Sequence, residues 1–264
     1  MRGFGLVVLF FVSLVVAAIA MFPLSQALNL MGAKSKGLAY ERAYGTIWSG
    51  ALDQANYIGQ PLGRVSFASR PLSLLSGALS VDFRISGQTA DGRGQARFGM
   101  GGVEIANTTA DVNVQNINNL DARLRQSPST LNISIKSLKL SYAGACRGGR
   151  SDIRTDLLTS VGRQWRWQGP AMTGELVCVD ERPSFDMRNE GGADQITAQM
   201  TLNDRGGYLA QAEVRTQNSD VIQALRALGF ESRGGAFVYE KQSGGVSQAA
   251  ARPAGRVEEI NYED

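Results

Sequence analysis

The sequence predicts a mainly β protein, with antiparallel sheets and two short helices behind a single N-terminal transmembrane helix. Three observations support this fold class. Residues 4–22 form an uncharged and largely apolar run, apolar and polar residues then alternate in several segments, and 31 of the 264 residues are glycine. Only 19% of the residues are charged, which favours strands and turns over long solvent-exposed helices.

The apolar run at residues 4–22 predicts a membrane anchor. A helix of this length, rising ~1.5 Å per residue, covers roughly the 30 Å hydrocarbon core of a bilayer. Arg2 precedes the run, whereas Lys34, Lys36 and Arg42 follow it and favour the opposite orientation. A short basic start, an apolar core and a long polar remainder are typical of an export signal. We therefore expect a cytoplasmic N-terminus and a periplasmic bulk.

Cleavage of this segment is an open alternative. Residues 18–20, Ala-Ile-Ala, have the small-x-small form that signal peptidase accepts after Ala20. The apolar run continues through Phe22, however, and the following stretch is amphipathic, as expected where an anchor leaves a bilayer. We favour an uncleaved single-pass anchor at residues 1–23, followed by an amphipathic linker at residues 24–44.

The remainder of the chain is predicted to form strands of one-sided sheets. Apolar and polar residues alternate at 79–85, 110–114, 131–136, 196–202 and 208–214. This period of two is typical of half-buried antiparallel strands. The alternation slips by one residue between Ile135 and Leu138, which would invert the buried face. We expect a β-bulge there.

Glycine-rich polar segments predict the turns between these strands. Residues 203–207, Asn-Asp-Arg-Gly-Gly, predict a hairpin between the last two strands. Residues 91–94, Asp-Gly-Arg-Gly, predict another turn after the strand at 79–85.

Two segments show the spacing of short amphipathic helices. One runs from Asn218 to Gly229, with a capping residue at its start and glycine at its end. The other is expected over residues 152–161, with Ser151 as its N-cap and Gly162 at its end.

The elements group into two consecutive periplasmic β units, at residues 45–127 and 128–240. The second unit contains both cysteines. Residues 241–264 are rich in Ser, Gly, Ala and Gln and are predicted to form a disordered tail.

Cys146 and Cys178 are the two cysteines of the chain. In an oxidising compartment such a pair predicts a disulfide. The alternative is a pair of buried free thiols, because cysteine packs readily in apolar cores.

The composition argues against an enzyme or a nucleic-acid-binding protein. The chain has no histidine, which excludes histidine-dependent triads and most metal sites. Asp180 and Glu181 are adjacent, and neighbours on a strand point to opposite faces, so they do not form a catalytic carboxylate pair. A net charge of +3 with scattered basic residues does not indicate nucleic acid. We expect no catalytic residue, cofactor or metal.

Several motifs, in their order, resemble type II secretion system protein N. They are Gly-Thr-Ile-Trp-Ser-Gly at 45–50, Leu-Gly at 62–63, Pro-Leu-Ser-Leu-Leu-Ser-Gly at 71–77, Gly-Glu-Leu-Val-Cys at 174–178, Gly-Tyr at 207–208 and Ala-Leu-Arg-Ala-Leu-Gly at 224–229. With the anchor and linker, the resemblance extends over nearly the whole chain to Tyr239. The motif at 45–50 is its most specific part.

The resemblance implies a non-catalytic component of the apparatus that moves folded proteins across the outer membrane of Gram-negative bacteria. Such a component is anchored in the inner membrane, and its partners are other secretion-apparatus proteins. The sheets of this family also look like those of AsmA-like proteins, whose curved sheets are associated with lipid handling and outer-membrane biogenesis. An AsmA-like role with lipid as a partner is therefore the alternative.

The family motif has a direct physical interpretation. Gly45 and Gly50 allow tight backbone geometry around Thr46, and Trp48 supplies bulk between them. The default role of Trp48 is packing, with a partner contact as the alternative. Trp165 and Trp167 have the same two interpretations, and they share one face if their segment is a strand.

Overall fold

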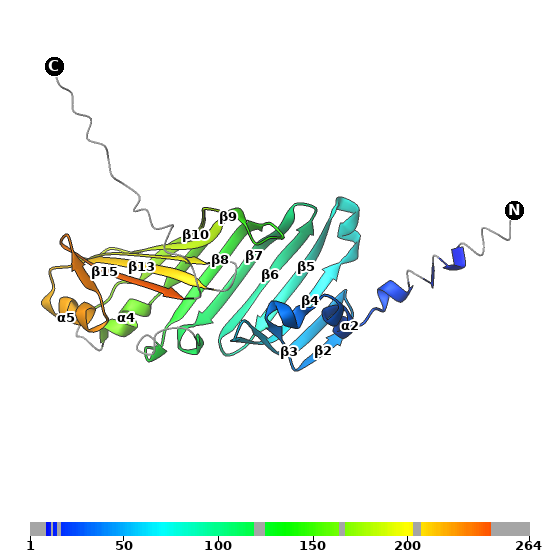
Figure 1. Cartoon of the computed structure of the whole chain (residues 1–264), viewed down its shortest axis with the longest axis horizontal. Coiled ribbons are helices and arrows are strands. Elements are labelled where there is room, and N and C mark those ends of the chain that lie inside the picture. Colours follow the sequence, from blue (N-terminus) through cyan, green and yellow to red (C-terminus); the bar gives the residue numbers. More distant parts are fainter. Residues whose placement is uncertain are drawn as a thin grey trace, which may run out of the picture.

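A computed structural model describes residues 9–11, 13–14, 17–118, 125–163, 167–202 and 207–243. Within these ranges, 15 strands form one sheet in which every assigned pair is antiparallel, with short helices at its ends (Figure 1). The predicted mainly β, antiparallel fold is thereby confirmed. Each strand from β3 to β12 pairs with the next strand in sequence, whereas β13 pairs with β15, and β15 pairs with β14.

The element bounds follow the chain. The helices are α2 (Leu24–Leu30), α4 (Leu157–Gly162) and α5 (Ser219–Ala227), with short 3-10 turns η1 (Ala33–Lys36), η2 (Pro71–Ser76) and η3 (Val114–Asn116). The strands are β1 (Leu38–Ala39), β2 (Arg42–Gly45), β3 (Ser49–Tyr57), β4 (Gln60–Arg70), β5 (Ala78–Ser86), β6 (Ala90–Gly99), β7 (Gly102–Asn113), β8 (Thr130–Leu140), β9 (Cys146–Thr155), β10 (Met172–Val179), β11 (Arg182–Asn189), β12 (Gln195–Leu202), β13 (Tyr208–Arg215), β14 (Glu231–Arg233) and β15 (Ala236–Ser243).

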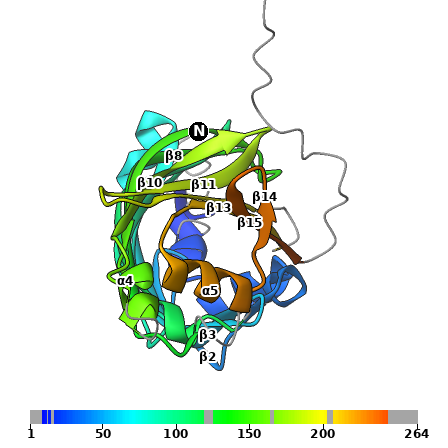
Figure 2. The ribbon, with the colours of Figure 1, turned by 90° about the vertical axis from the view of Figure 1, so that its left-hand side faces the viewer.

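The sheet is long and curled, and α5 lies inside the curve (Figure 2). Cross-strand pairing aligns apolar residues on the inner face, for example Phe67 with Phe83 and Phe185 with Met200. Because side chains alternate along each strand, the polar residues between them lie on the outer face. The curled sheet therefore has an apolar interior and a polar exterior.

Three apolar clusters occupy this interior. At one end, Leu24 and Leu28 of α2 pack against Leu52 and Ala55 of β3. At the other end, residues of α5 pack on the last strands, and the buried members of this cluster are Met172, Ile196, Val214, Val221, Leu225 and Phe237. The third cluster lies between them and contains Leu138, Cys146, Ile153 and Leu176. Helices thus cover both ends of the inner face.

The predicted β-bulge is confirmed. The register between β8 and β9 shifts between Ile135 and Ser137, so Lys136 is the extra residue. The extra residue keeps Ile135 and Leu138 on the inner face. The hairpin of β12 and β13 is also present, with Leu202 opposite Tyr208, while turn residues 203–206 lie outside the described residues.

The turn predicted at residues 91–94 is wrong, because these residues lie inside β6. The turn between β5 and β6 comes earlier, where Gly87 N donates to Ala90 O. Gly94 serves packing instead: a Cβ there would lie 2.9 Å from Cζ of Phe83 and 2.7 Å from Cβ of Thr108. The glycine makes room for neighbouring side chains on the inner face.

The helix predicted over residues 152–161 is also wrong in its first half. Strand β9 continues to Thr155, and α4 begins only at Leu157. Ile153 pairs with Ile133 on one side and Gly174 on the other and is only 2% exposed, so burial between two strands overrides its helical spacing. Ser151 caps no helix, since its Oγ accepts from Leu176 N at 2.6 Å.

Helix α5 agrees with the sequence prediction. Asn218 is its N-cap, and the Asn218 side chain accepts from the backbone N–H groups of Asp220 and Val221. Gly229 follows with a φ of +90°, the left-handed conformation expected after a helix end.

Replacing Asn218 with alanine should lower the free energy of unfolding by about 1 kcal/mol, because two helix N–H groups lose their acceptor. Urea denaturation followed by circular dichroism measures this change. Ser219→Ala, one residue further on, is the matched control and should leave the midpoint nearly unchanged. Equal effects of the two substitutions would contradict the capping role.

The two predicted β units share a single sheet, because β7 pairs with β8 from Val103 opposite Leu140 to Asn113 opposite Thr130. The predicted linker at 24–44 contains α2, β1 and the first three residues of β2, so it is part of the fold. Residues 241–243 complete β15 and do not belong to a disordered tail; residues 244–264 lie outside the described residues.

In the predicted anchor, the described residues 9–11, 13–14 and 17–20 are helical. Within the described part of the chain, no helix has the length and apolar character needed to cross a membrane. The anchor stays a prediction.

Candidate functional site

The family motif at residues 45–50 forms the turn between β2 and β3. Gly45 pairs with Gly50, and Thr46 N donates to Ser49 O at 2.9 Å. The Thr46 hydroxyl accepts from the backbone N–H groups of Trp48 and Ser49 at 3.3 and 3.4 Å. Gly45 has a φ of +86°, and a Cβ there would collide with the Ser49 carbonyl. The turn therefore requires glycine at this position.

This turn holds the end of the N-terminal apolar run. Ile47 N donates to Phe22 O at 3.1 Å, and Pro23 forms a β-bridge with Thr46. The Trp48 indole N–H donates to Ile19 O at 3.2 Å. The half-buried Trp48 therefore contacts the N-terminal segment of its own chain.

Gly50 allows α2 to approach the sheet. A Cβ at Gly50 would lie 2.8 Å from Cδ2 of Leu24 and 2.5 Å from the Tyr44 carbonyl. Leu24 is the first residue of α2 and is buried. The motif thus joins three parts: the turn, the apolar run and the helix that covers the inner face.

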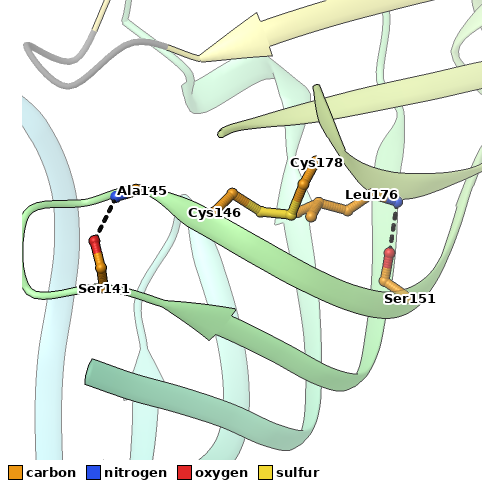
Figure 3. Close-up of a disulfide and its surroundings, with 6 residues drawn as sticks. All are labelled: Ser141, Ala145, Cys146, Ser151, Leu176 and Cys178. Atoms are coloured by element: carbon orange, nitrogen blue, oxygen red, sulfur yellow. Dashed lines mark hydrogen bonds between the residues drawn. A yellow bond between two sulfur atoms is a disulfide. The ribbon is translucent and has the colours of Figure 1, made fainter. Parts of the chain in front are cut away.

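Cys146 and Cys178 form a disulfide, as predicted, which excludes the alternative of free thiols (Figure 3). Their Cα atoms lie 5.5 Å apart, within the usual range. The disulfide connects the beginning of β9 with the end of β10, and the paired residues of these strands extend only from Met172↔Thr155 to Gly174↔Ile153. The disulfide therefore joins β9 and β10 beyond the last paired residues of these two strands.

The two remaining tryptophan predictions differ in outcome. Trp165 lies outside the described residues. Trp167 is half-buried against the cluster beneath α5, and its indole N–H donates to Asp194 at 3.0 Å. Residues 167–170 form no strand. Packing and one hydrogen bond account for the Trp167 side chain.

Asp180 and Glu181 form the turn between β10 and β11, with φ values of +49° and +60°. The strand position expected for these two residues is therefore wrong, because both lie in a turn. Among the described residues, no group of three or more His, Cys, Asp or Glu side chains is arranged to hold a metal ion.

An apolar cavity of about 360 Å³ lies inside the curl, between β9 to β13 and the helix α5. Its lining includes Phe185, Met200, Ala212, Leu225, Leu228 and Tyr239. A dry apolar cavity of about 150 Å³ already suffices to bind benzene. The small residues Ala198, Ala210 and Ala212 also line this cavity, and no sequence pattern predicts it.

The fold and the docked N-terminal segment define a β-sheet scaffold with an apolar interior. A family model for type II secretion system (T2SS) protein N matches residues 36–239 of the chain. The chain belongs to this family of secretion-apparatus components, which is generally non-catalytic, and the resemblance found in the sequence is confirmed. Membership implies interaction with other components of the apparatus. No curated protein and no solved structure gives a significant match.

Proposed function

We propose that this chain is a non-catalytic, inner-membrane-anchored component of the type II secretion apparatus, with a cytoplasmic N-terminus and a periplasmic sheet. It acts through protein contacts in the export of folded proteins across the outer membrane. The observation that carries the proposal is the family match over residues 36–239. The docking of Phe22 and Ile19 onto the motif at 45–50 supports a rigid connection between anchor and sheet.

The outer face of the sheet offers surfaces for such contacts. A polar groove of about 760 Å³ crosses β7 to β11, and its lining includes Asp152, Arg154, Glu175, Asp186 and Arg188. Charges of both signs on one face favour selection of a partner with complementary charges. The terminal strand β14 is short and fully exposed, with an ion pair between Glu231 and Arg233. A short, charged edge of this kind disfavours the addition of a partner strand, so the groove is the candidate contact surface.

Deletion of the gene tests the secretion role. We expect exoproteins to accumulate in the periplasm and to disappear from the culture medium, while outer-membrane integrity is unchanged. Complementation with the wild-type chain should restore secretion. Normal secretion in the deletion strain, together with sensitivity to detergents, would contradict the proposal and favour the second candidate.

The second candidate function is lipid handling, and the apolar cavity favours it. About 360 Å³ of apolar space beneath α5 continues the apolar inner face of the sheet. Binding pockets for small ligands fall in the range of about 300 to 1,000 Å³. An acyl chain is the ligand whose shape and chemistry fit such a space.

Filling the cavity separates this candidate from the first. Ala198 lines the cavity, and its neighbour Thr197 is exposed on the opposite face of β12. The lipid-handling candidate predicts that Ala198→Phe removes lipid that co-purifies with the full chain, whereas Thr197→Phe does not. Mass spectrometry of extracted lipid measures both. The absence of bound lipid in the wild-type chain would contradict this candidate.

A further inference from the structure

The turn η2 exposes leucine side chains where a soluble turn would present polar ones. Leu72 and Leu75 are 81% and 89% exposed, and Leu74 is 51% exposed. Single exposed apolar residues are common on protein surfaces, but a cluster marks a site of contact.

The serines of this turn face its own backbone. The Ser73 hydroxyl donates to Arg70 O at 2.6 Å and accepts from Ser80 N at 2.8 Å. The Ser76 hydroxyl donates to Ser73 O at 2.6 Å, and Gly77 N donates to Leu74 O. Because these polar groups are satisfied within the turn, moving it into an apolar medium leaves few groups without partners.

The turn lies beside the docked N-terminal segment. The Trp48 carbonyl accepts from both Ser69 N at 2.6 Å and Ser69 Oγ at 2.7 Å, and η2 begins at Pro71. The same Trp48 donates to Ile19 O. In Figure 1 this cyan turn lies at the end of the molecule from which the N-terminal segment extends. Trp48 therefore bonds both to the N-terminal apolar run and to Ser69, two residues before η2.

The geometry points to a lipid surface as the partner of η2: Leu72, Leu74 and Leu75 enter the headgroup and acyl boundary of the bilayer that holds the N-terminal segment. This inference rests on the proposed membrane anchor. Interfacial insertion by apolar side chains and an amphipathic indole at the headgroup level are common membrane contacts. The sheet is then held at the membrane by the N-terminal segment and by η2. The ends of the strands that carry the β2–β3 turn and η2 face the membrane.

A fluorescent probe in the full chain tests this contact. Leu75→Cys is labelled with an environment-sensitive nitrobenzoxadiazole dye, because the native cysteines are joined in a disulfide and do not react. The protein is reconstituted in phosphatidylethanolamine and phosphatidylglycerol vesicles that contain lipids with a nitroxide near the headgroup. Gln88→Cys is the matched control, because Gln88 is exposed in the β5–β6 turn, at the other end of β5 from η2.

We expect blue-shifted emission and strong nitroxide quenching at position 75, and weak quenching at position 88. Adding Leu72→Ser and Leu74→Ser should reduce the quenching at position 75. Equal, weak quenching at both positions would overturn the contact, and if the protein still resists extraction by alkaline carbonate, the anchor would stand. Release of the protein by carbonate would overturn the anchor and the contact together.

Discussion

Replacing both cysteines with serine should lower the free energy of unfolding by about 3 to 4 kcal/mol. The disulfide closes a loop with a sequence separation of 32, and the chain-entropy model gives a loss of this size for such a loop. The expected cost exceeds that of a helix cap, because the bond restricts the whole unfolded ensemble. Urea denaturation of the wild-type and double-variant chains measures the difference.

The structural effect should be local to the junction of β9 and β10. Beyond Gly174↔Ile153 these strands are connected by the Ser151 to Leu176 hydrogen bond and by the disulfide. Without the disulfide, we expect faster amide hydrogen exchange at Leu176 and Val177 than at residues of β12. Uniform exchange across the sheet would contradict a role at this junction.

Reduction of the wild-type chain is the control for the substitution itself. If the lost cross-link accounts for the whole effect, the reduced wild type and the double serine variant unfold at the same urea concentration. Cys146 is buried, so serine also places a hydroxyl among apolar side chains. A double variant that is less stable than reduced wild type would measure that second effect. A loss below about 1 kcal/mol under reduction would contradict the entropic contribution.

The alternation of apolar residues predicted the strands well, because the sheet has one apolar and one polar face. It failed where a residue has neighbours that are distant in sequence. Ile153 has helical spacing with Leu157, yet its environment is set by Ile133 and Gly174 on adjacent strands. Gly94 looks like a turn glycine, but the Phe83 ring decides its role.

The curl and the cavity depend on all the strands together, and no local pattern encodes them. Small residues such as Ala210 and Ala212 are compatible with tight packing as well as with a cavity, and the position of α5 decides between them. The motif at 45–50 was the opposite case. Its glycines were predicted to allow tight geometry, but the contacts of Ile47 with Phe22 and of Gly50 with Leu24 became known only from the structure.

Replacing Gly45 with alanine should destabilise the chain by more than the same change at Gly59. Both residues have left-handed backbones, with φ values of +86° and +79°. A Cβ at Gly45 would collide with the Ser49 carbonyl, whereas a Cβ at Gly59 has no neighbour within 4 Å. The left-handed conformation costs alanine about 1 to 2 kcal/mol at either site. Crowding at Gly45 should add about 1 to 3 kcal/mol.

Urea denaturation of the two variants isolates the collision, because the backbone conformation is matched. Equal midpoints would show that the β2–β3 turn relaxes without cost, in contradiction to the tight geometry of the motif. Gly50→Val tests the other side of the turn, since its side chain would displace Leu24 of α2. We expect faster proteolysis within residues 24–44 of this variant, because α2 loses its contact with the sheet.

The Gly50→Val variant also connects the docking to secretion. If the sheet must be held firmly to the anchor, exoproteins should accumulate in the periplasm of a strain that produces Gly50→Val, even where the protein level equals that of the wild type. A strain that produces Gly59→Ala should secrete normally, because the β3–β4 turn that contains Gly59 lies at the other end of β3 from the motif. Normal secretion by a Gly50→Val chain with an exposed linker would mean that the sheet works without rigid docking, and that the motif serves stability alone.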